Sequence, residues 1–176
     1  MNKADARAYG LQARKSLSEA QRQEYDRLLL KQMKQLAEHA SMIGCYVSMK
    51  DEADTHAFLN WCFAEGKKIA VPRVADGTLA FHRICSLSEL HHGAFGVLEP
   101  DADTERVQTD AIDVMFVPLS AFDSQYHRTG YGKGYYDSVL TASMKKIGLA
   151  YPEQKTEERI ETEPHDITLD TVLIPL

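Results

Sequence analysis

The chain has 176 residues, of which 44% are hydrophobic and 26% charged, and this composition fits one globular domain over residues 1–176. It excludes disordered, collagen-like and fibrous proteins. With 20 Lys and Arg against 26 Asp and Glu, the net charge of −6 also disfavours sequence-independent binding to nucleic acid phosphates.

The first 40 residues predict two helices, because they are rich in Ala, Leu, Gln, Lys, Arg and Glu and lack strand-like alternation. Ser18 and Gln21 have the spacing of a capping box, so the second helix should begin near Glu19. Its apolar residues recur at steps of three and four, which predicts a stripe that faces the core. The stripe consists of Tyr25, Leu29, Met33 and Leu36.

Strands and helices then alternate along the chain. Residues 42–47 predict a strand, the amphipathic stretch around Trp61 predicts a helix that ends at Gly66, and residues 68–71 predict a strand closed by Pro72. This order of strand, helix and strand is typical of a parallel crossover.

The middle of the chain contains its most apolar segment. Residues 79–84 predict a further strand, residues 86–90 a single helical turn, and residues 93–109 a loop rich in Pro, Gly and acidic residues. Residues 112–117 are the most apolar run and end at Pro118, which favours a buried central strand of a parallel sheet.

A long connection follows over residues 118–134, and a loop of this length after a central strand is usually functional. Residues 135–142 then predict a helix, and residues 146–151 and 171–174 predict two strands. We therefore expect an α/β fold with an N-terminal helical pair.

The cysteines and the N-terminus indicate the cellular setting. Cys45, Cys62 and Cys85 are far apart and form no C-x-x-C pair, so neither a disulfide framework nor a zinc knuckle is expected. The N-terminus lacks the apolar core of a signal peptide, and no apolar run approaches the roughly 18 residues of a membrane helix. We expect a soluble, cytoplasmic monomer that binds neither nucleic acid nor a membrane.

Three glycines at alternating positions, Gly130, Gly132 and Gly134, mark the most unusual segment. They let successive backbone amides converge on an anion, and the helix expected after them would add its positive end. The spacing fits neither a Walker A loop nor a dinucleotide fingerprint, yet Arg128 and Lys133 supply the charge that a polyphosphate needs. A flexible Gly-Tyr turn is the alternative, and the net charge disfavours stacking on single-stranded RNA.

A second cationic group lies near the N-terminus. Lys3, Arg7 and Arg14 are separated by four and seven residues, so they share one face of a helix, and Lys15 follows them directly. This face can dock an anionic ligand. The alternative is a solvated helix face near a chain terminus.

Asp137, Asp166 and Asp170 are candidate magnesium ligands, because magnesium beside phosphates uses one or two carboxylates and keeps several waters. The alternatives are charge complementation at a helix N-terminus for Asp137 and a loop cap for Asp166. No two of the seven histidines have ligand spacing, which disfavours a zinc site. No serine or cysteine has the context of a nucleophile elbow, so covalent catalysis has no support.

Two stretches of the chain form one recognisable motif, Val117 to Asp123 and Arg128 to Asp137. This motif resembles the central motif of the 5-formyltetrahydrofolate cyclo-ligase family, whose members are also called methenyltetrahydrofolate synthetases. Further family landmarks follow in family order, so the resemblance covers nearly the whole chain. They are Arg14 to Ser18, Ser48 to Thr55, Gly66 to Arg73, Phe95 to Pro100 and His165 to Asp170. The departures are Ala53, where a larger aliphatic residue is common, and Tyr131 and Lys133, where other members vary.

The resemblance implies an open, mostly parallel sheet layered with helices, related to the ribose-phosphate isomerase and CoA-transferase group. It also implies an enzyme, a ligase that uses ATP and Mg2+ to convert 5-formyltetrahydrofolate into 5,10-methenyltetrahydrofolate, with release of ADP and phosphate. ATP would phosphorylate the formyl oxygen to give an iminium phosphate, and N10 would then attack the activated carbon. The protein would mainly position the reactants and stabilise charge.

The resemblance assigns residues to each ligand. The ATP-binding positions are Lys3, Arg7, Thr129, Gly130, Tyr131, Gly132, Lys133, Gly134, Tyr135, Tyr136 and Asp137. The folate-binding positions are Met49, Asp54, Gly132, Lys133, Gly134, Tyr135 and Tyr136. The metal ligands are Asp137 and Asp166. We further expect Lys133 and Arg128 to act catalytically on the transferring phosphate. Tyr136 should stack near the pterin, and Arg14 should lie near the anionic end of a ligand.

Two other functions remain open at this point. A sugar-phosphate isomerase on the same fold would use the glycine loop for a phosphate monoester and an Asp or Glu as base, without ATP. A non-catalytic regulator would bind folate or nucleotide without turnover.

Overall fold

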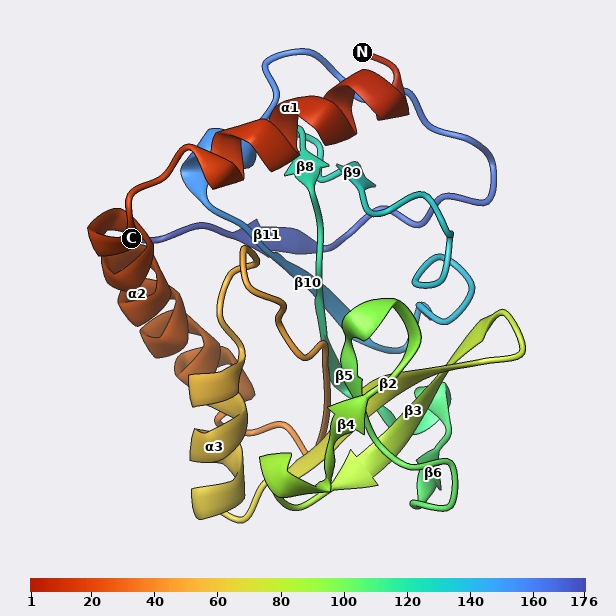
Figure 1. Ribbon diagram of the computed structural model, residues 1–176. Coiled ribbons are helices and arrows are strands. Elements are labelled where there is room, and N and C mark those ends of the chain that lie inside the picture. The colour runs from red at the N-terminus through yellow and green to blue at the C-terminus, as the bar shows by residue number, and fades with distance from the viewer.

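The computed structural model describes residues 1–176 and contains a mixed seven-stranded sheet, three α-helices and two small two-stranded sheets (Figure 1). The strand order of the large sheet is β11-β10-β7-β1-β2-β3-β6. Neighbouring strands from β11 to β2 are parallel, whereas β3 is antiparallel to both β2 and β6. The expected α/β fold with an open, mostly parallel sheet is confirmed.

The large sheet is built from β1 (Met42–Cys45), β2 (Lys68–Ala75), β3 (Thr78–Ile84), β6 (Arg106–Val107), β7 (Val114–Val117), β10 (Lys145–Leu149) and β11 (Thr171–Leu173). The small sheets pair β4 (His91–His92) with β5 (Leu98–Glu99) and β8 (Ala121–Phe122) with β9 (Arg128–Thr129). The α-helices are α1 (Lys3–Lys15), α2 (Glu19–Ala37) and α3 (His56–Ala64). Short 3-10 turns lie at Leu87–Glu89, Ala94–Gly96, Thr109–Ala111 and Pro152–Gln154.

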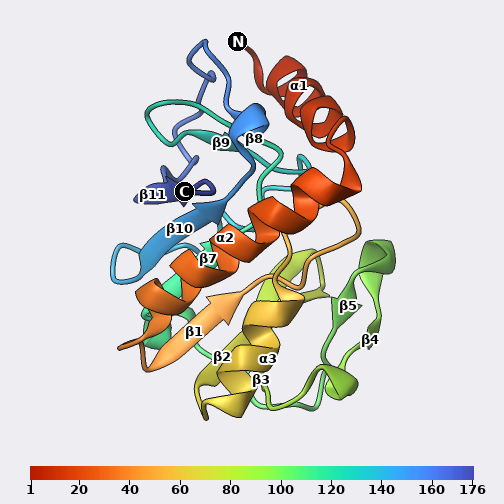
Figure 2. The same ribbon diagram turned by 90° about the vertical axis from the view of Figure 1, so that its left-hand side faces the viewer.

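Both expected N-terminal helices are present. The Asn2 side chain accepts from the N–H of Asp5 at the start of α1. Ser18 accepts from the N–H of Gln21 at 3.1 Å, so α2 begins at Glu19 as predicted. α2 and α3 lie side by side on one face of the sheet (Figure 2), whereas α1 lies over the β8–β9 pair at the top of Figure 1.

Two hydrophobic clusters cover the two faces of the sheet. Alternate side chains of β7 divide between them, with Val114 and Phe116 in one cluster and Met115 and Val117 in the other. All four residues are buried, which confirms the prediction of a buried central strand. The predicted stripe of α2 packs into the first cluster through Tyr25, Leu29, Met33 and Leu36.

The predicted end of a strand at Pro72 is wrong, because β2 continues through this proline to Ala75. Beyond Ala70, β2 pairs only with β3, and a strand with one open edge tolerates a residue without an N–H. β2 and β3 form a hairpin whose turn places Asp76 at φ 52° and Gly77 at φ 76°. The predicted loop over residues 93–109 is also interrupted by β5 and β6.

The predicted helix over residues 135–142 is absent, and these residues form turns. Gly134 enters the segment at φ 68°, which is not a helical conformation. The Asp137 carboxylate is held from two sides, by the Arg128 guanidinium and by the N–H of Ile167. These tertiary contacts fix the segment in another path, so the glycine loop has no helix N-terminus behind it.

None of the helices combines the length and the apolar character that crossing a membrane requires. The thiols of Cys45, Cys62 and Cys85 are all free, and the first two are buried. Burial raises the pKa of Cys62 to about 12, so this thiol stays protonated at neutral pH.

Candidate active site

A cavity of about 690 Å³ opens beyond the carboxyl ends of the central parallel strands. Tyr46 and Val47 follow β1 into its wall, and Pro118 follows β7. Ligands of open α/β sheets bind at this edge, and the volume is in the range of small-molecule sites. The cavity is therefore the candidate active site.

Two kinds of surface line the cavity. Apolar residues come mainly from the strand ends and the β2–β5 region in the lower part of Figure 1, and most charged residues come from α1, the glycine loop and the segment after β10. Two further acids, Glu52 and Glu99, come from the turn after β1 and from β5. The apolar set contains Tyr46, Val47, Met49, Pro72, Val74, Leu79, Phe95 and Val97. The charged set contains Lys3, Arg7, Arg128, Lys133, Asp137, Glu163 and Asp166. An amphiphilic ligand with one anionic end matches this division.

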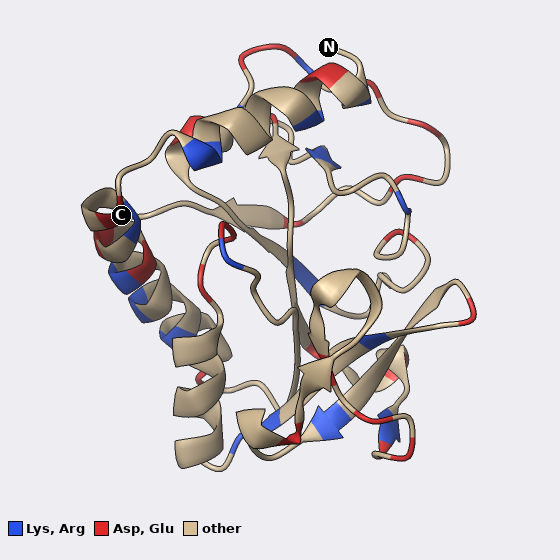
Figure 3. Ribbon diagram, viewed as in Figure 1, with Lys and Arg blue, Asp and Glu red and all other residues tan.

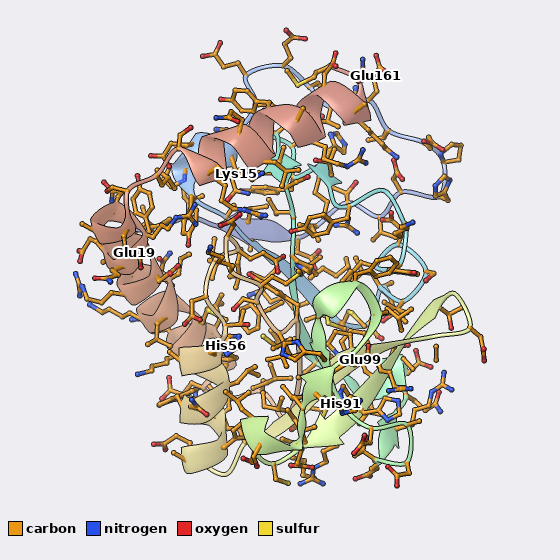
Figure 4. The ribbon with its side chains drawn as sticks, in the orientation of Figure 1. Lys15, Glu19, His56, His91, Glu99 and Glu161 are labelled. Carbon is orange, nitrogen blue, oxygen red and sulfur yellow. The ribbon has the colours of Figure 1, made fainter.

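The cations of α1 share one face, as predicted, and this face lies against the glycine loop. Figure 3 shows one Lys or Arg position of α1 beside that of β9, and another at the end of α1 that leads into α2. The Arg7 Nε atom donates to the carbonyl of Gly130 at 2.6 Å, and the Lys3 ammonium lies 2.5 Å from an oxygen of Asp166. Lys15, labelled in Figure 4, is exposed at the end of the helix and does not line the cavity.

The position of Arg14 differs from the prediction, which places this residue near the anionic end of a ligand. Its side chain is buried, does not line the cavity and donates to the Leu119 carbonyl and to the Tyr131 hydroxyl, the latter at 3.0 Å. The chain packs α1 so closely here that a Cβ on Gly10 would lie 1.8 Å from the carbonyl oxygen of Ser120. Arg14 therefore joins the helix to the glycine loop.

Every residue of the predicted glycine loop, from Thr129 to Asp137, lines the cavity. Gly132 and Gly134 have φ angles of 86° and 68°, a conformation that only glycine adopts without strain. A Cβ on Gly132 would also meet the Arg7 guanidinium at 3.3 Å. These two glycines shape a loop whose backbone can receive an anion, with the Arg7 side chain against it.

The two predicted phosphate cations, Arg128 and Lys133, both line the cavity but have different partners. The side chain of Arg128 is only 7% exposed, and burial lowers its pKa while the neighbouring Asp137 opposes that effect. Its Nη2 atom donates to Asp137 at 3.0 Å, but its buried Nε–H has no partner. The Lys133 ammonium lies 5.4 Å from the centre of the exposed Phe95 ring at the cavity wall.

The two predicted metal ligands lie at one corner of the cavity. Asp137 accepts from the N–H of Ile167 at 3.0 Å, and Ile167 directly follows Asp166 in the chain. Although burial raises the pKa of Asp166, the Lys3 ammonium and the N–H of Glu163 hold it below its usual value. Two carboxylates, completed by waters and phosphate oxygens, are a donor set that suits magnesium. No group of three or more His, Cys, Asp or Glu side chains forms a fuller protein cage.

One of the predicted folate-binding residues, Asp54, does not line the cavity. Met49 lines the cavity, but Asp54 does not, because its carboxylate accepts from the N–H groups of His56 and Ala57 at the start of α3. Figure 4 marks His56 at that helix end, away from the glycine loop. The acid of this turn that faces the cavity is Glu52, two residues earlier. No pattern in the sequence distinguishes the two acids, since both lie in one acidic turn.

Other lining residues also escaped prediction. Glu99, labelled in Figure 4, is buried on β5 and pairs with Arg73 across the β2 edge. Phe95 is 65% exposed and has a φ angle of 58°, which is unusual for an aromatic residue. Both belong to the segment Phe95 to Pro100, which the sequence marks only as a landmark. Tyr136 lines the cavity as predicted, with its ring packed edge-on against Phe81.

Comparisons with known proteins agree with this geometry. The model of the 5-formyltetrahydrofolate cyclo-ligase family matches residues 1–175. The 5-formyltetrahydrofolate cyclo-ligase of Haemophilus influenzae is 31% identical over 143 residues, covering 77% of this chain and 76% of the relative. The mouse 5-formyltetrahydrofolate cyclo-ligase is 28% identical over 151 residues, covering 77% of this chain and 74% of the relative.

Two solved structures have the same fold. The 5,10-methenyltetrahydrofolate synthetase of Aquifex aeolicus superposes with a TM-score of 0.85 at 32% identity, covering 98% of this chain and 88% of that one. The 5,10-methenyltetrahydrofolate synthetase of Mycoplasma pneumoniae gives a TM-score of 0.79 at 25% identity, covering 99% of both chains.

Proposed function

The chain belongs to the 5-formyltetrahydrofolate cyclo-ligase family, and we propose that it uses ATP and Mg2+ to cyclise 5-formyltetrahydrofolate to 5,10-methenyltetrahydrofolate. The observation that carries this proposal is a single cavity with an anion-binding loop on one side and an apolar wall on the other. The whole chain acts as one domain, because the cavity draws on residues from Lys3 to Asp166.

The triphosphate of ATP binds at the charged side. Lys3 and Arg7 of α1 lie there with the backbone of the glycine loop, and Lys133 and Arg128 reach the phosphoryl group that is transferred. The unpartnered Nε–H of Arg128 is a free buried donor beside this region. Ligand binding exchanges the carboxylate partners of Lys3 and Arg128 for phosphate oxygens.

Asp137 and Asp166 hold the magnesium ion in this arrangement, and the ion supplies neutralisation of phosphate charge during transfer. Both carboxylates lose a cationic partner when Lys3 and Arg128 turn to phosphate, which frees their oxygens. The protein residues otherwise orient the nucleotide and exclude water from the reacting atoms.

The folate lies along the apolar wall. Met49 and Phe95 are exposed at that wall, and Tyr136 of the glycine loop also lines the cavity. The pterin ring and the aromatic ring that follows it offer flat apolar faces to these side chains. This placement brings the formyl group toward the glycine loop, where the terminal phosphate is held.

The chemistry follows from the weak electrophilicity of a formamide. Phosphorylation of the formyl oxygen gives an iminium phosphate, N10 attacks its carbon, and inorganic phosphate leaves. No side chain forms a covalent bond to the substrate, and the residues named above position reactants and stabilise charge.

The proposal is tested by mixing the protein with 5-formyltetrahydrofolate and recording methenyl absorbance with and without Mg-ATP. We expect product only when ATP and magnesium are both present, with one ADP released per product. A folded protein that forms no product contradicts the proposal. Activity on sugar phosphates without ATP would indicate an isomerase, and binding without turnover a regulator.

A further inference from the structure

The side chain of Ser120 is buried against the start of the glycine loop. Ser120 lies between β7 and β8, is fully buried and does not line the cavity. Its hydroxyl shares its proton between the carbonyls of Thr129 at 3.0 Å and Gly130 at 3.2 Å. The Thr129 hydroxyl lies 2.7 Å from the Ser120 oxygen and can donate to it in turn. One serine side chain therefore contacts two successive carbonyl groups of the loop.

Both carbonyls also accept from a second donor. The Ser120 N–H donates to the Thr129 carbonyl at 2.7 Å, and the Arg7 Nε atom donates to the Gly130 carbonyl at 2.6 Å. Ser120 is itself fixed, because its own carbonyl accepts from the buried Gln154 side chain at 2.9 Å. These contacts fix the two peptide units that begin at Thr129 and Gly130.

The orientation of the two carbonyls determines that of two N–H groups. In a planar trans peptide the N–H of one residue points opposite to the carbonyl of the residue before it, and the chain contains no cis peptide bond. The N–H groups of Gly130 and Tyr131 therefore point away from Ser120. Neither donates to another group of the chain, and both residues line the cavity. Successive N–H groups that point to one side form a site for an anion.

We propose that Ser120 is a positioning residue that directs the N–H groups of Gly130 and Tyr131 toward the phosphates of ATP, an inference that rests on the proposed function. Ser120 acts through the loop and touches neither substrate, because it lies outside the cavity wall. Without its hydroxyl, the Gly130 carbonyl keeps only the Arg7 donor. The peptide unit then gains freedom that ATP binding must remove, which weakens binding.

The test compares S120A with T156V. Thr156 is a matched control, because its buried hydroxyl also donates to backbone carbonyls, those of Phe122 and Glu158, but it neither lines the cavity nor contacts the glycine loop. Both variants should lower the unfolding temperature, because each loses hydrogen bonds of a buried hydroxyl. Only S120A should bind inorganic triphosphate about fivefold more weakly than the parent, measured by calorimetry on the whole protein.

Kinetics separate positioning from a general loss of stability. In S120A, KM for ATP should rise about fivefold, whereas kcat and KM for 5-formyltetrahydrofolate should stay within twofold of the parent. S120C keeps the shape of the side chain with a weaker donor and should weaken triphosphate binding at least twofold. This variant provides the comparison if S120A does not fold.

Two results would overturn the role of Ser120. They are triphosphate binding in S120A and S120C equal to that of the parent, and an equal loss of triphosphate binding in T156V. A folded parent without ATP-dependent product would overturn the proposed function instead, and the triphosphate measurements would still decide whether Ser120 orients the loop.

Discussion

Gly10 of α1 offers a direct test of how the charged wall is positioned. A Cβ at this residue would lie 1.8 Å from the Ser120 carbonyl oxygen, and real contacts of this kind are at least 3.0 Å long. In G10A the helix must therefore move about 1.2 Å away from β8 at this point. Lys3 and Arg7 move with it, because they belong to the same helix.

The displacement has two measurable effects. Overpacking of this kind costs about 1–3 kcal/mol of unfolding free energy, more than the roughly 1 kcal/mol that alanine gains over glycine in helix propensity. A misplacement of about 1 Å at catalytic groups lowers activity up to about 100-fold. We expect G10A to unfold at a lower temperature and to raise KM for ATP at least tenfold, because the bond from Arg7 to Gly130 is lost.

The assay compares thermal unfolding and ATP kinetics of G10A with those of A8G. Ala8 is exposed on the same helix, so its replacement loses about 1 kcal/mol of helix propensity without moving α1. A8G should therefore lower the unfolding temperature and leave KM for ATP unchanged. Parental stability and kinetics in G10A would refute the close approach of α1 to Ser120.

Three further predictions follow from other parts of the molecule. K133A should abolish measurable turnover while folate still binds, as shown by fluorescence titration, and retained ATP-dependent turnover would contradict the role of Lys133 on phosphate. F95A should raise KM for folate about tenfold and leave KM for ATP unchanged, because an exposed aromatic wall is lost, and equal effects on both constants would count against that assignment. D123N should lose on the order of 2 kcal/mol in denaturant unfolding at pH 7, because the buried carboxylate accepts from His127 and from the N–H of Ile160. Burial raises the pKa of Asp123, but these donors hold it below its usual value, so their stabilisation is complete above about pH 4 and is lost as pH falls through the lowered pKa. A difference between parent and D123N that persists at pH 2 would contradict this origin.

The parts of the fold that local patterns control were predictable. The start of α2 depends on a local contact, in which the Ser18 side chain accepts from the N–H of Gln21 in the first turn. The burial of residues 112–117 follows from their apolar run. The shared face of Lys3 and Arg7 follows from helical geometry. These features need no knowledge of distant residues.

The predictions were wrong where contacts between residues far apart in the sequence determine the local structure. The turns over residues 135–142 replace a helix because Asp137 is bound by Arg128 and by the N–H of Ile167, which is 30 residues away. The Asp54 carboxylate accepts from two backbone N–H groups at the start of α3, whereas Glu52 faces the cavity, an arrangement that depends on how the turn of residues 48–55 folds between them. Neither the turns over residues 135–142 nor the orientation of the two acids is indicated by local composition or spacing.

The central claim is that the loop between Arg128 and Asp137 directs the terminal phosphate of ATP onto the formyl oxygen. It is tested most directly with 5-formyltetrahydrofolate that carries oxygen-18 in the formyl group. After complete conversion with Mg-ATP, mass spectrometry of the released inorganic phosphate should find the label there. Unlabelled phosphate, with the label in water, would contradict phosphorylation of the formyl oxygen and with it the account of this site.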